Sequence, residues 1–236
     1  MVLHKSMDSE SYMKIKLCGF TDPISIKFAL KYCPDFMGFV FYPPSKRNIT
    51  LNQAKRFSKI DFGQTKKIAV IVDENDGNIS KIIDSLQPDL LQLHGNESVS
   101  RCQEIKDKFS LPIIKAIAIS NEEDVSHFVE ISQNYNQIAD FLLFDTKSQE
   151  RGGSGLSFDW RILERLNLKQ NFFLSGGIDI DNFKEAAETT GANFFDLSSG
   201  IEEIKGLKSL DKIKNLMNFF HEYQQAKPFG DRKSVV

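Results

Sequence analysis

Three glycine-serine segments could bring backbone N–H groups close to a ligand. Ser175-Gly176-Gly177 and Ser198-Ser199-Gly200 each follow a short apolar run, and Gly152-Gly153-Ser154-Gly155 lies in a longer polar stretch. Successive N–H groups, and the start of a following helix, attract anions. Each of the first two segments is also typical of an ordinary turn, but on neighbouring strands they favour a phosphate site. The third is either a lid over a substrate or merely a long loop.

Two side chains that could transfer protons also stand at the ends of apolar runs. Cys18 precedes Gly19, and a thiolate there could act as a base or nucleophile, although a lone cysteine is often a packing residue. Asp145 follows Phe144, where a carboxyl group could serve as an acid or base, or could cap a turn. The residue types alone leave both alternatives open at each position.

Three further polar residues lie at or near such run ends. Arg47 comes just after the run 36–41 and could hold a carboxylate with its planar guanidinium. His94 ends the run 90–93, where it would either line a site or serve as a structural histidine. Asp196 lies inside an apolar run, where an unpaired carboxylate is costly, so we expect it to orient a neighbouring group or loop. The sequence has neither a catalytic triad nor a set of residues spaced for a metal.

Eight apolar runs must position these residues. They are nearly continuous rather than alternating, which suits strands that are buried on both faces. Their starts lie roughly 20 to 30 residues apart, about one strand-helix unit of a barrel. The segments between them, such as 98–109, 180–189 and 209–223, have apolar residues at helical spacing. The runs are 15–18, 36–41, 68–72, 90–93, 113–117, 141–144, 172–174 and 194–197.

Eight such units predict a single-domain (β/α)8 TIM barrel of the α/β class. An open doubly wound sheet is the alternative, but it more often has five or six strands. Function in a barrel belongs at the carboxyl ends of the strands, and the loops after strands seven and eight are its common phosphate site. No Gly/Ser/Pro linker divides the 236 residues, so we expect an extension over 1–13, the barrel over 14–224 and a tail over 225–236.

Composition limits the class of partner. The formal charge is -2, which gives no general reason to expect nucleic acid or an anionic membrane, while a small anionic substrate stays compatible. The N-terminal segment has no apolar stretch typical of a signal peptide, and no apolar run approaches the roughly 20 residues that span a bilayer. The three cysteines are far apart in the sequence, which suggests reduced thiols and not a disulfide framework. We therefore expect a cytoplasmic protein.

The chain resembles the phosphoribosylanthranilate isomerase family of tryptophan biosynthesis over residues 14–217. The segments that carry the resemblance come in order along the chain and stand mostly at predicted strand ends. They are 16–21, 38–47, 91–95, 114–117, 144–147, 152–155, 158–160, 175–177 and 196–200.

The resemblance implies an Amadori rearrangement of N-(5-phosphoribosyl)anthranilate, with no metal or cofactor. Asp145 would be the general acid that opens the ribose ring, and Cys18 the general base that removes the proton at C2. Arg47 would hold the anthranilate carboxylate, while His94 would line the substrate site and Asp196 would support the open-chain intermediates. The phosphate ligands would be Gly176, Gly177, Ser198, Ser199 and Gly200. The resemblance leaves a monomer or a homodimer open.

Some residues depart from the family pattern, and other functions compete with it. Leu156 replaces a lysine after the lid segment, Leu17 and Phe20 differ around the cysteine, and residues 72–75 have no clear role. The isomerase of histidine biosynthesis uses aspartates as acid and base and repeats internally, which this chain does not. Indoleglycerol-phosphate synthase needs a lysine acid that the sequence does not place. A non-catalytic barrel would predict the loss of Cys18 or Asp145.

Overall fold

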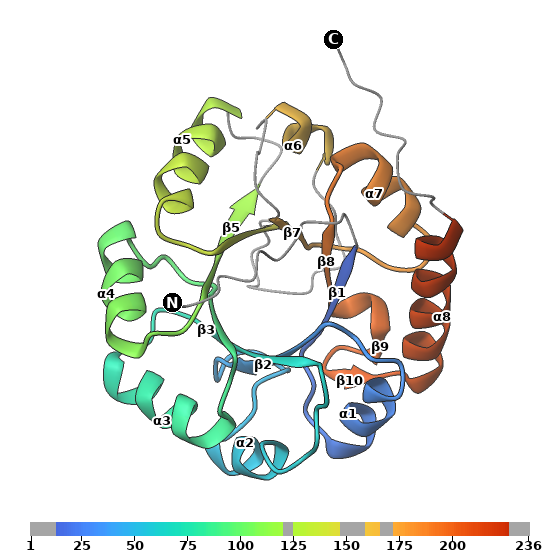
Figure 1. Ribbon diagram of the computed structural model, residues 1–236, viewed down its shortest axis with the longest axis horizontal. Helices are drawn as coiled ribbons and strands as arrows, with labels where there is room; N and C mark the ends of the chain where they lie inside the picture. Colours follow the sequence, from blue (N-terminus) through green and yellow to red (C-terminus); the bar gives the residue numbers. More distant parts are fainter. Residues whose placement is uncertain (1–12, 120–124, 147–158, 166–171, 227–236) are drawn as a thin grey trace, which may run out of the picture.

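The chain forms one closed barrel. In the computed structural model residues 13–119, 125–146, 159–165 and 172–226 are described, and they form eight parallel strands surrounded by eight α-helices (Figure 1). Each strand pairs with the next along the chain, and β8 pairs with β1 to close the ring. This confirms the predicted single-domain (β/α)8 barrel over the open sheet. The lid segment 152–155 and Leu156 lie outside the described residues.

The eight strands fall where the apolar runs predict them. Four runs match the strands residue for residue, whereas β1 and β3 begin earlier than predicted and β5 and β6 continue further. Asp145 consequently lies within β6 instead of directly after it. The strands are β1 Lys14–Cys18, β2 Phe36–Phe41, β3 Lys66–Ile71, β4 Leu90–Leu93, β5 Ile113–Ile119, β6 Phe141–Thr146, β7 Phe172–Leu174 and β8 Phe194–Leu197.

The helices cover the outer face of the barrel, and several begin at a side-chain cap. Asp22, Thr50, Asn75 and Ser98 each accept a hydrogen bond from a backbone N–H of the first turn, which satisfies donors that have no partner within the helix. The helices are α1 Pro23–Leu30, α2 Leu51–Phe57, α3 Asp76–Leu86, α4 Val99–Phe109, α5 Val125–Asn136, α6 Arg161–Arg165, α7 Phe183–Thr190 and α8 Leu210–Ala226. In the part of the chain that the structure describes, no helix is both long and apolar enough to cross a bilayer.

A small hairpin follows β8 and was not expected from the sequence. A 3-10 turn over Ser199–Ile201 leads into β9, Glu202–Ile204, which pairs with the antiparallel β10, Leu207–Lys208. Strands of two and three residues carry too little periodicity to be recognised. The Thr21 hydroxyl donates to the Gly206 carbonyl at 3.3 Å, so the hairpin packs beside the loop after β1.

The inside of the barrel changes from aromatic to polar along its axis. Four phenylalanines near the amino ends of their strands contact one another, with ring centroids 5.0 to 6.3 Å apart. They are Phe36, Phe141, Phe173 and Phe194. Side chains alternate between the two faces of a strand, so the inward position two residues further along β6 and β8 carries Leu143 and Asp196. Aromatic packing therefore closes one end, and polar groups line the other.

Candidate active site

Cys18 and Lys16 share the inward face of β1. They are two residues apart, and Cys18 stands opposite Gly38 of β2 in the parallel register. A Cβ atom on Gly38 would lie 2.5 Å from the Cys18 Sγ and 3.1 Å from the Lys16 Cε, so only glycine leaves room for both side chains. Burial raises the pKa of the Cys18 thiol above its ordinary value, and the charge of Lys16 opposes that rise.

Lys16 is fully buried and binds two side chains. Its Nζ lies 2.7 Å from Asp196 Oδ2 on β8 and 2.7 Å from Gln92 Oε1 on β4. Burial lowers the pKa of Lys16, but the charges of Asp196 and Cys18 outweigh this, so its pKa ends above the ordinary value. Asp196 is therefore paired, as its place in an apolar strand demanded. Its other oxygen, Oδ1, is buried and has no hydrogen-bond partner among the described residues.

A row of polar contacts continues from Lys16 to Asp145. Gln92 Nε2 lies 2.8 Å from His94 Nδ1, and His94 Nε2 lies 3.2 Å from Asp145 Oδ2. The other Asp145 oxygen accepts the backbone N–H of Thr146 at 3.0 Å. His94, for which a structural role was the alternative, thus contacts the candidate acid directly.

Arg47 meets an acidic residue of the hairpin. Its Nε and Nη2 bind the two oxygens of Glu202 at 2.7 and 2.6 Å, and Lys208 Nζ binds Glu202 Oε1 at 2.9 Å. All three residues are buried. Burial lowers the pKa of Lys208 to about 8. Arg47 thus forms a bidentate pair with an internal carboxylate, which the sequence analysis did not anticipate.

The two glycine-serine segments lie side by side after β7 and β8. Gly176 and Gly177 have φ of +91° and +68°, conformations that favour glycine. A Cβ on Gly200 would lie 2.3 Å from the Ile178 carbonyl oxygen, so the second segment rests against the first. The Ser198 hydroxyl donates to the Cys18 carbonyl at 3.1 Å, which brings the loop after β8 to the end of β1.

One cavity at the carboxyl ends of the strands collects most of the predicted residues. Gly200 does not line it, and Gln92 lines it without having been predicted as a site residue. Among the described residues no group of His, Cys, Asp and Glu is arranged to hold a metal ion. The predicted residues in its wall are Cys18, Arg47, His94, Asp145, Gly176, Gly177, Asp196, Ser198 and Ser199.

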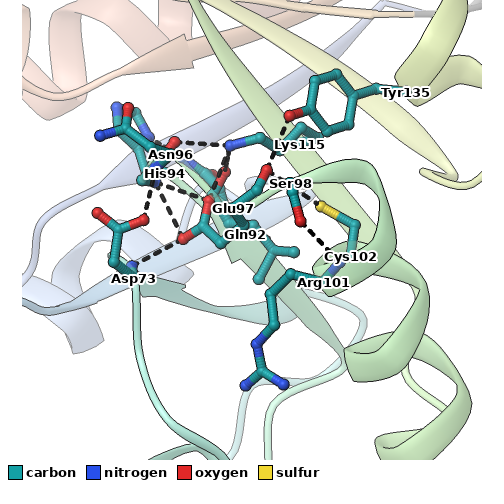
Figure 2. A network of polar contacts seen from close by, with 12 residues as sticks. Asp73, Gln92, His94, Asn96, Glu97, Ser98, Arg101, Cys102, Lys115 and Tyr135 are labelled. Carbon is teal, nitrogen blue, oxygen red and sulfur yellow. Dashed lines mark hydrogen bonds and ion pairs between the residues drawn. The ribbon is translucent and has the colours of Figure 1, made fainter.

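A second polar network supports the wall that carries His94 (Figure 2). The Glu97 carboxylate accepts Lys115 Nζ at 2.8 Å, the Asp73 N–H at 2.8 Å and the Gly95 N–H at 3.0 Å. Asp73 in turn accepts the Asn96 N–H at 2.6 Å. These contacts join the loops after β3 and β4 to β5. They give a structural role to Asp73, within a segment whose role the sequence left unclear.

Lys16, Gln92, Glu202 and Lys208 are the site residues that sequence reasoning missed. For Lys16 a signal existed, because a lysine inside a strand that is buried on both faces must find a partner. Glu202 and Lys208 stand on the unrecognised hairpin. The contacts of Glu202 and Lys208 depend on the fold of this hairpin, which has no sequence signature.

Comparison with known proteins agrees with this geometry. The family model described as N-(5'-phosphoribosyl)anthranilate (PRA) isomerase matches residues 15–219. The chain belongs to this family.

Curated relatives and solved structures carry the same name. A Bradyrhizobium sp. (strain ORS 278) N-(5'-phosphoribosyl)anthranilate isomerase is 38% identical over 86% of this chain and 93% of its own length. The Brucella canis isomerase is 37% identical over 93% of this chain and 99% of its own. The crystal structure of the Thermotoga maritima isomerase covers 91% of this chain and 100% of its own, at a TM-score of 0.76 and 32% identity. The barrel of this chain therefore matches that of the Thermotoga maritima isomerase over nearly its whole length.

Another solved isomerase of the family was crystallised with reduced 1-(o-carboxyphenylamino)-1-deoxyribulose 5-phosphate. It has a TM-score of 0.75 and 28% identity, and it covers 89% of this chain and 99% of its own. That relative therefore accommodates a phosphorylated sugar joined to a carboxyphenylamino group.

Proposed function

We propose that this chain converts N-(5'-phosphoribosyl)anthranilate into 1-(2-carboxyphenylamino)-1-deoxyribulose 5-phosphate, with Asp145 as the acid and Cys18 as the base. The observation that carries the proposal is that both side chains line one cavity together with the two glycine-serine loops. They enter it from β6 and β1, which are separated by β7 and β8 on the shorter way around the barrel. A sugar tethered at the loops can thus be reached from two sides.

The first step opens the ribose ring. Asp145 gives its proton to the ring oxygen, the bond between that oxygen and C1 breaks, and the nitrogen lone pair forms a C1=N bond. Two groups can stabilise the resulting Asp145 carboxylate: the Thr146 N–H at 3.0 Å and His94 Nε2 at 3.2 Å. Stabilisation of the carboxylate favours release of the proton.

The second step removes the proton at C2. The Cys18 thiolate takes it, the C–H electrons form a C1=C2 bond, and the cationic nitrogen becomes a neutral amine. The enolamine then tautomerises to the ketone. Because burial raises the pKa of Cys18, the thiolate depends on nearby positive charge.

The remaining polar groups would hold the substrate. Gly176, Gly177, Ser198 and Ser199 line the cavity where the phosphate is proposed to bind, and Gly200 packs against the Ile178 carbonyl beside them. Arg47 would hold the anthranilate carboxylate while it stays paired with Glu202. Asp196 Oδ1, which has no hydrogen-bond partner in the described part of the chain, would accept a sugar hydroxyl.

The oligomeric state and the location stay predictions. A solved structure of the family shows monomers made from the dimeric isomerase of Thermotoga maritima. For this chain we propose a monomer or a homodimer in the cytoplasm, with a small phosphorylated molecule as its partner.

The proposal is tested by generating phosphoribosylanthranilate in situ and following the loss of its fluorescence. We expect purified protein to accelerate the decay in proportion to its concentration. A matched preparation of the Cys18→Ala/Asp145→Asn double variant corrects for spontaneous decay and for contaminating host enzyme. Equal decay with both preparations would contradict the proposed function.

A further inference from the structure

Lys16 contacts groups that lead to both proposed proton-transfer residues, although nothing above gives it a part in the reaction. We propose that Lys16 is a positioning residue shared by base and acid: it stabilises the Cys18 thiolate, and through Gln92 it sets which nitrogen of His94 carries the proton that faces Asp145. This inference rests on the proposed function, because it takes the roles of Cys18 and Asp145 from it.

The contact between Lys16 and Cys18 follows from the barrel itself. Their side chains leave the same face of β1 and meet over Gly38, whose missing Cβ both would otherwise strike. An ammonium group has three N–H donors, and two of those on Lys16 go to Asp196 and Gln92 at 2.7 Å each. Burial lowers the pKa of Lys16, and the charges of Asp196 and Cys18 raise it. A cation beside the sulfur favours the thiolate over the thiol.

Other charged groups also act on the thiol, so the share of Lys16 must be separated from theirs. Asp196 on β8 raises the pKa of Cys18, whereas Lys208 on β10 lowers it. Arg47 lies in the loop after β2. Burial lowers its pKa, but Glu202 raises it, and the charge of Cys18 adds to that rise. Of these groups, Lys16 exerts the largest charge effect on the pKa of Cys18, and that effect lowers the pKa.

The second half of the inference follows from the direction of the hydrogen bonds. An ammonium group can only donate, so the Gln92 atom that faces Lys16 must be the carbonyl oxygen. The Gln92 amide N–H group then points at His94 Nδ1, 2.8 Å away, and makes that nitrogen an acceptor. A neutral His94 must carry its proton on Nε2, which faces Asp145 Oδ2. Lys16 thereby orients a donor toward the carboxylate that forms when the ring opens.

Alkylation of Cys18 by iodoacetamide tests the first half without relying on turnover. We compare Asp196→Asn with the double variant Lys16→Met/Asp196→Asn, because the two differ only at Lys16 and neither leaves a buried carboxylate at position 196. Carbamidomethylation of Cys18 is quantified by mass spectrometry from pH 6 to 11, and the exposed Cys33 in the same sample reports the activity of the reagent.

We expect the midpoint for Cys18 to lie at least about one pH unit higher in the double variant, or about tenfold slower alkylation at pH 8. Equal midpoints in two variants that show cooperative thermal unfolding would overturn the role at Cys18. Because the readout is thiol reactivity, it can fail while the isomerase activity is present, and it can succeed while that activity is absent.

The second half is tested on the unaltered protein, so it does not depend on a variant that folds. Nitrogen-15 shifts of the His94 ring should show that its neutral form carries the proton on Nε2. In the Lys16→Met/Asp196→Asn variant we expect a mixture of both neutral forms, since the Gln92 amide is then free to turn over. A proton on Nδ1 in the unaltered protein would overturn the proposed direction of the hydrogen bonds.

Discussion

Two of the buried lysine–carboxylate pairs in the described part of the barrel differ in what surrounds them. Lys115 and Glu97 lie outside the strand ring, against Tyr135 of α5, and both Glu97 oxygens accept backbone or ammonium hydrogens (Figure 2). Lys16 and Asp196 lie inside the ring, and one Asp196 oxygen has no partner among the described residues.

The difference teaches how to separate structure from function in such pairs. A buried polar group without a partner costs free energy, so a fully satisfied carboxylate such as Glu97 needs no ligand to explain it. Asp196 belongs to the wall of the cavity, and we propose that a ligand hydroxyl completes the hydrogen bonding of its Oδ1. The Glu97–Lys115 pair joins the loops after β3 and β4 to β5, whereas the Lys16–Asp196 pair lies at the wall of the cavity.

The largest loss of stability should follow from breaking the Glu97–Lys115 pair. Lys115→Met leaves Glu97 as an uncompensated buried charge, and we expect a loss of about 3 to 5 kcal/mol in the free energy of unfolding in urea. Lys108→Met is the matched control, because Lys108 pairs with Asp76 at the surface, where such pairs contribute less than about 1 kcal/mol. Equal losses in the two variants would show that the Glu97–Lys115 pair does not hold the loops.

Substitution of the carboxylates of Glu97 and Asp196 by amides tests the difference between the two pairs. Glu97→Gln places an N–H group against donors that the carboxylate accepted, whereas Asp196→Asn can turn its N–H group toward the cavity and keep an oxygen on Lys16. We therefore expect Glu97→Gln to lose about 1 to 3 kcal/mol more unfolding free energy than Asp196→Asn. Urea unfolding at pH 7 measures this difference. A larger loss for Asp196→Asn would reverse our assignment of the two pairs.

A third buried lysine gives a smaller effect that depends on pH. Burial lowers the pKa of Lys208 to about 8, whereas an unfolded lysine titrates near about 10.4. Between these values the unfolded chain binds more protons, so the Lys208 contribution to stability rises as the pH increases. We expect the unfolding free energy of the unaltered protein, minus that of Lys208→Met, to increase by about 1 to 3 kcal/mol from pH 7 to 10.5. A constant difference would contradict the lowered pKa.

Much of the site could be predicted because the fold assigns chemistry to strand ends. Cys18, Asp145 and the two glycine-serine segments stood at the carboxyl ends of predicted strands, and the closed ring brings those ends together around one cavity. The apolar runs predicted the strands well because parallel strands that are buried on both faces are nearly continuous in apolar residues.

What could not be predicted was the partner of each charged group. Glu202 reaches Arg47 from a hairpin 155 residues away whose strands are too short to leave a pattern. Lys16 reaches Asp196 because β8 closes against β1 and sets them opposite each other in register. That pairing depends on closure of the barrel, a property of the whole chain and not of any local segment.

The most direct test of the central claim is the turnover rate of two single variants, Cys18→Ala and Asp145→Asn, with phosphoribosylanthranilate generated in situ. General acid–base groups contribute about 10²- to 10⁴-fold to a rate, and we predict a loss of at least about 100-fold in each variant. Affinity for the reduced product analogue should stay within about tenfold of the unaltered protein, since neither change touches the proposed phosphate loops. Turnover at the unaltered rate in either variant would contradict the account.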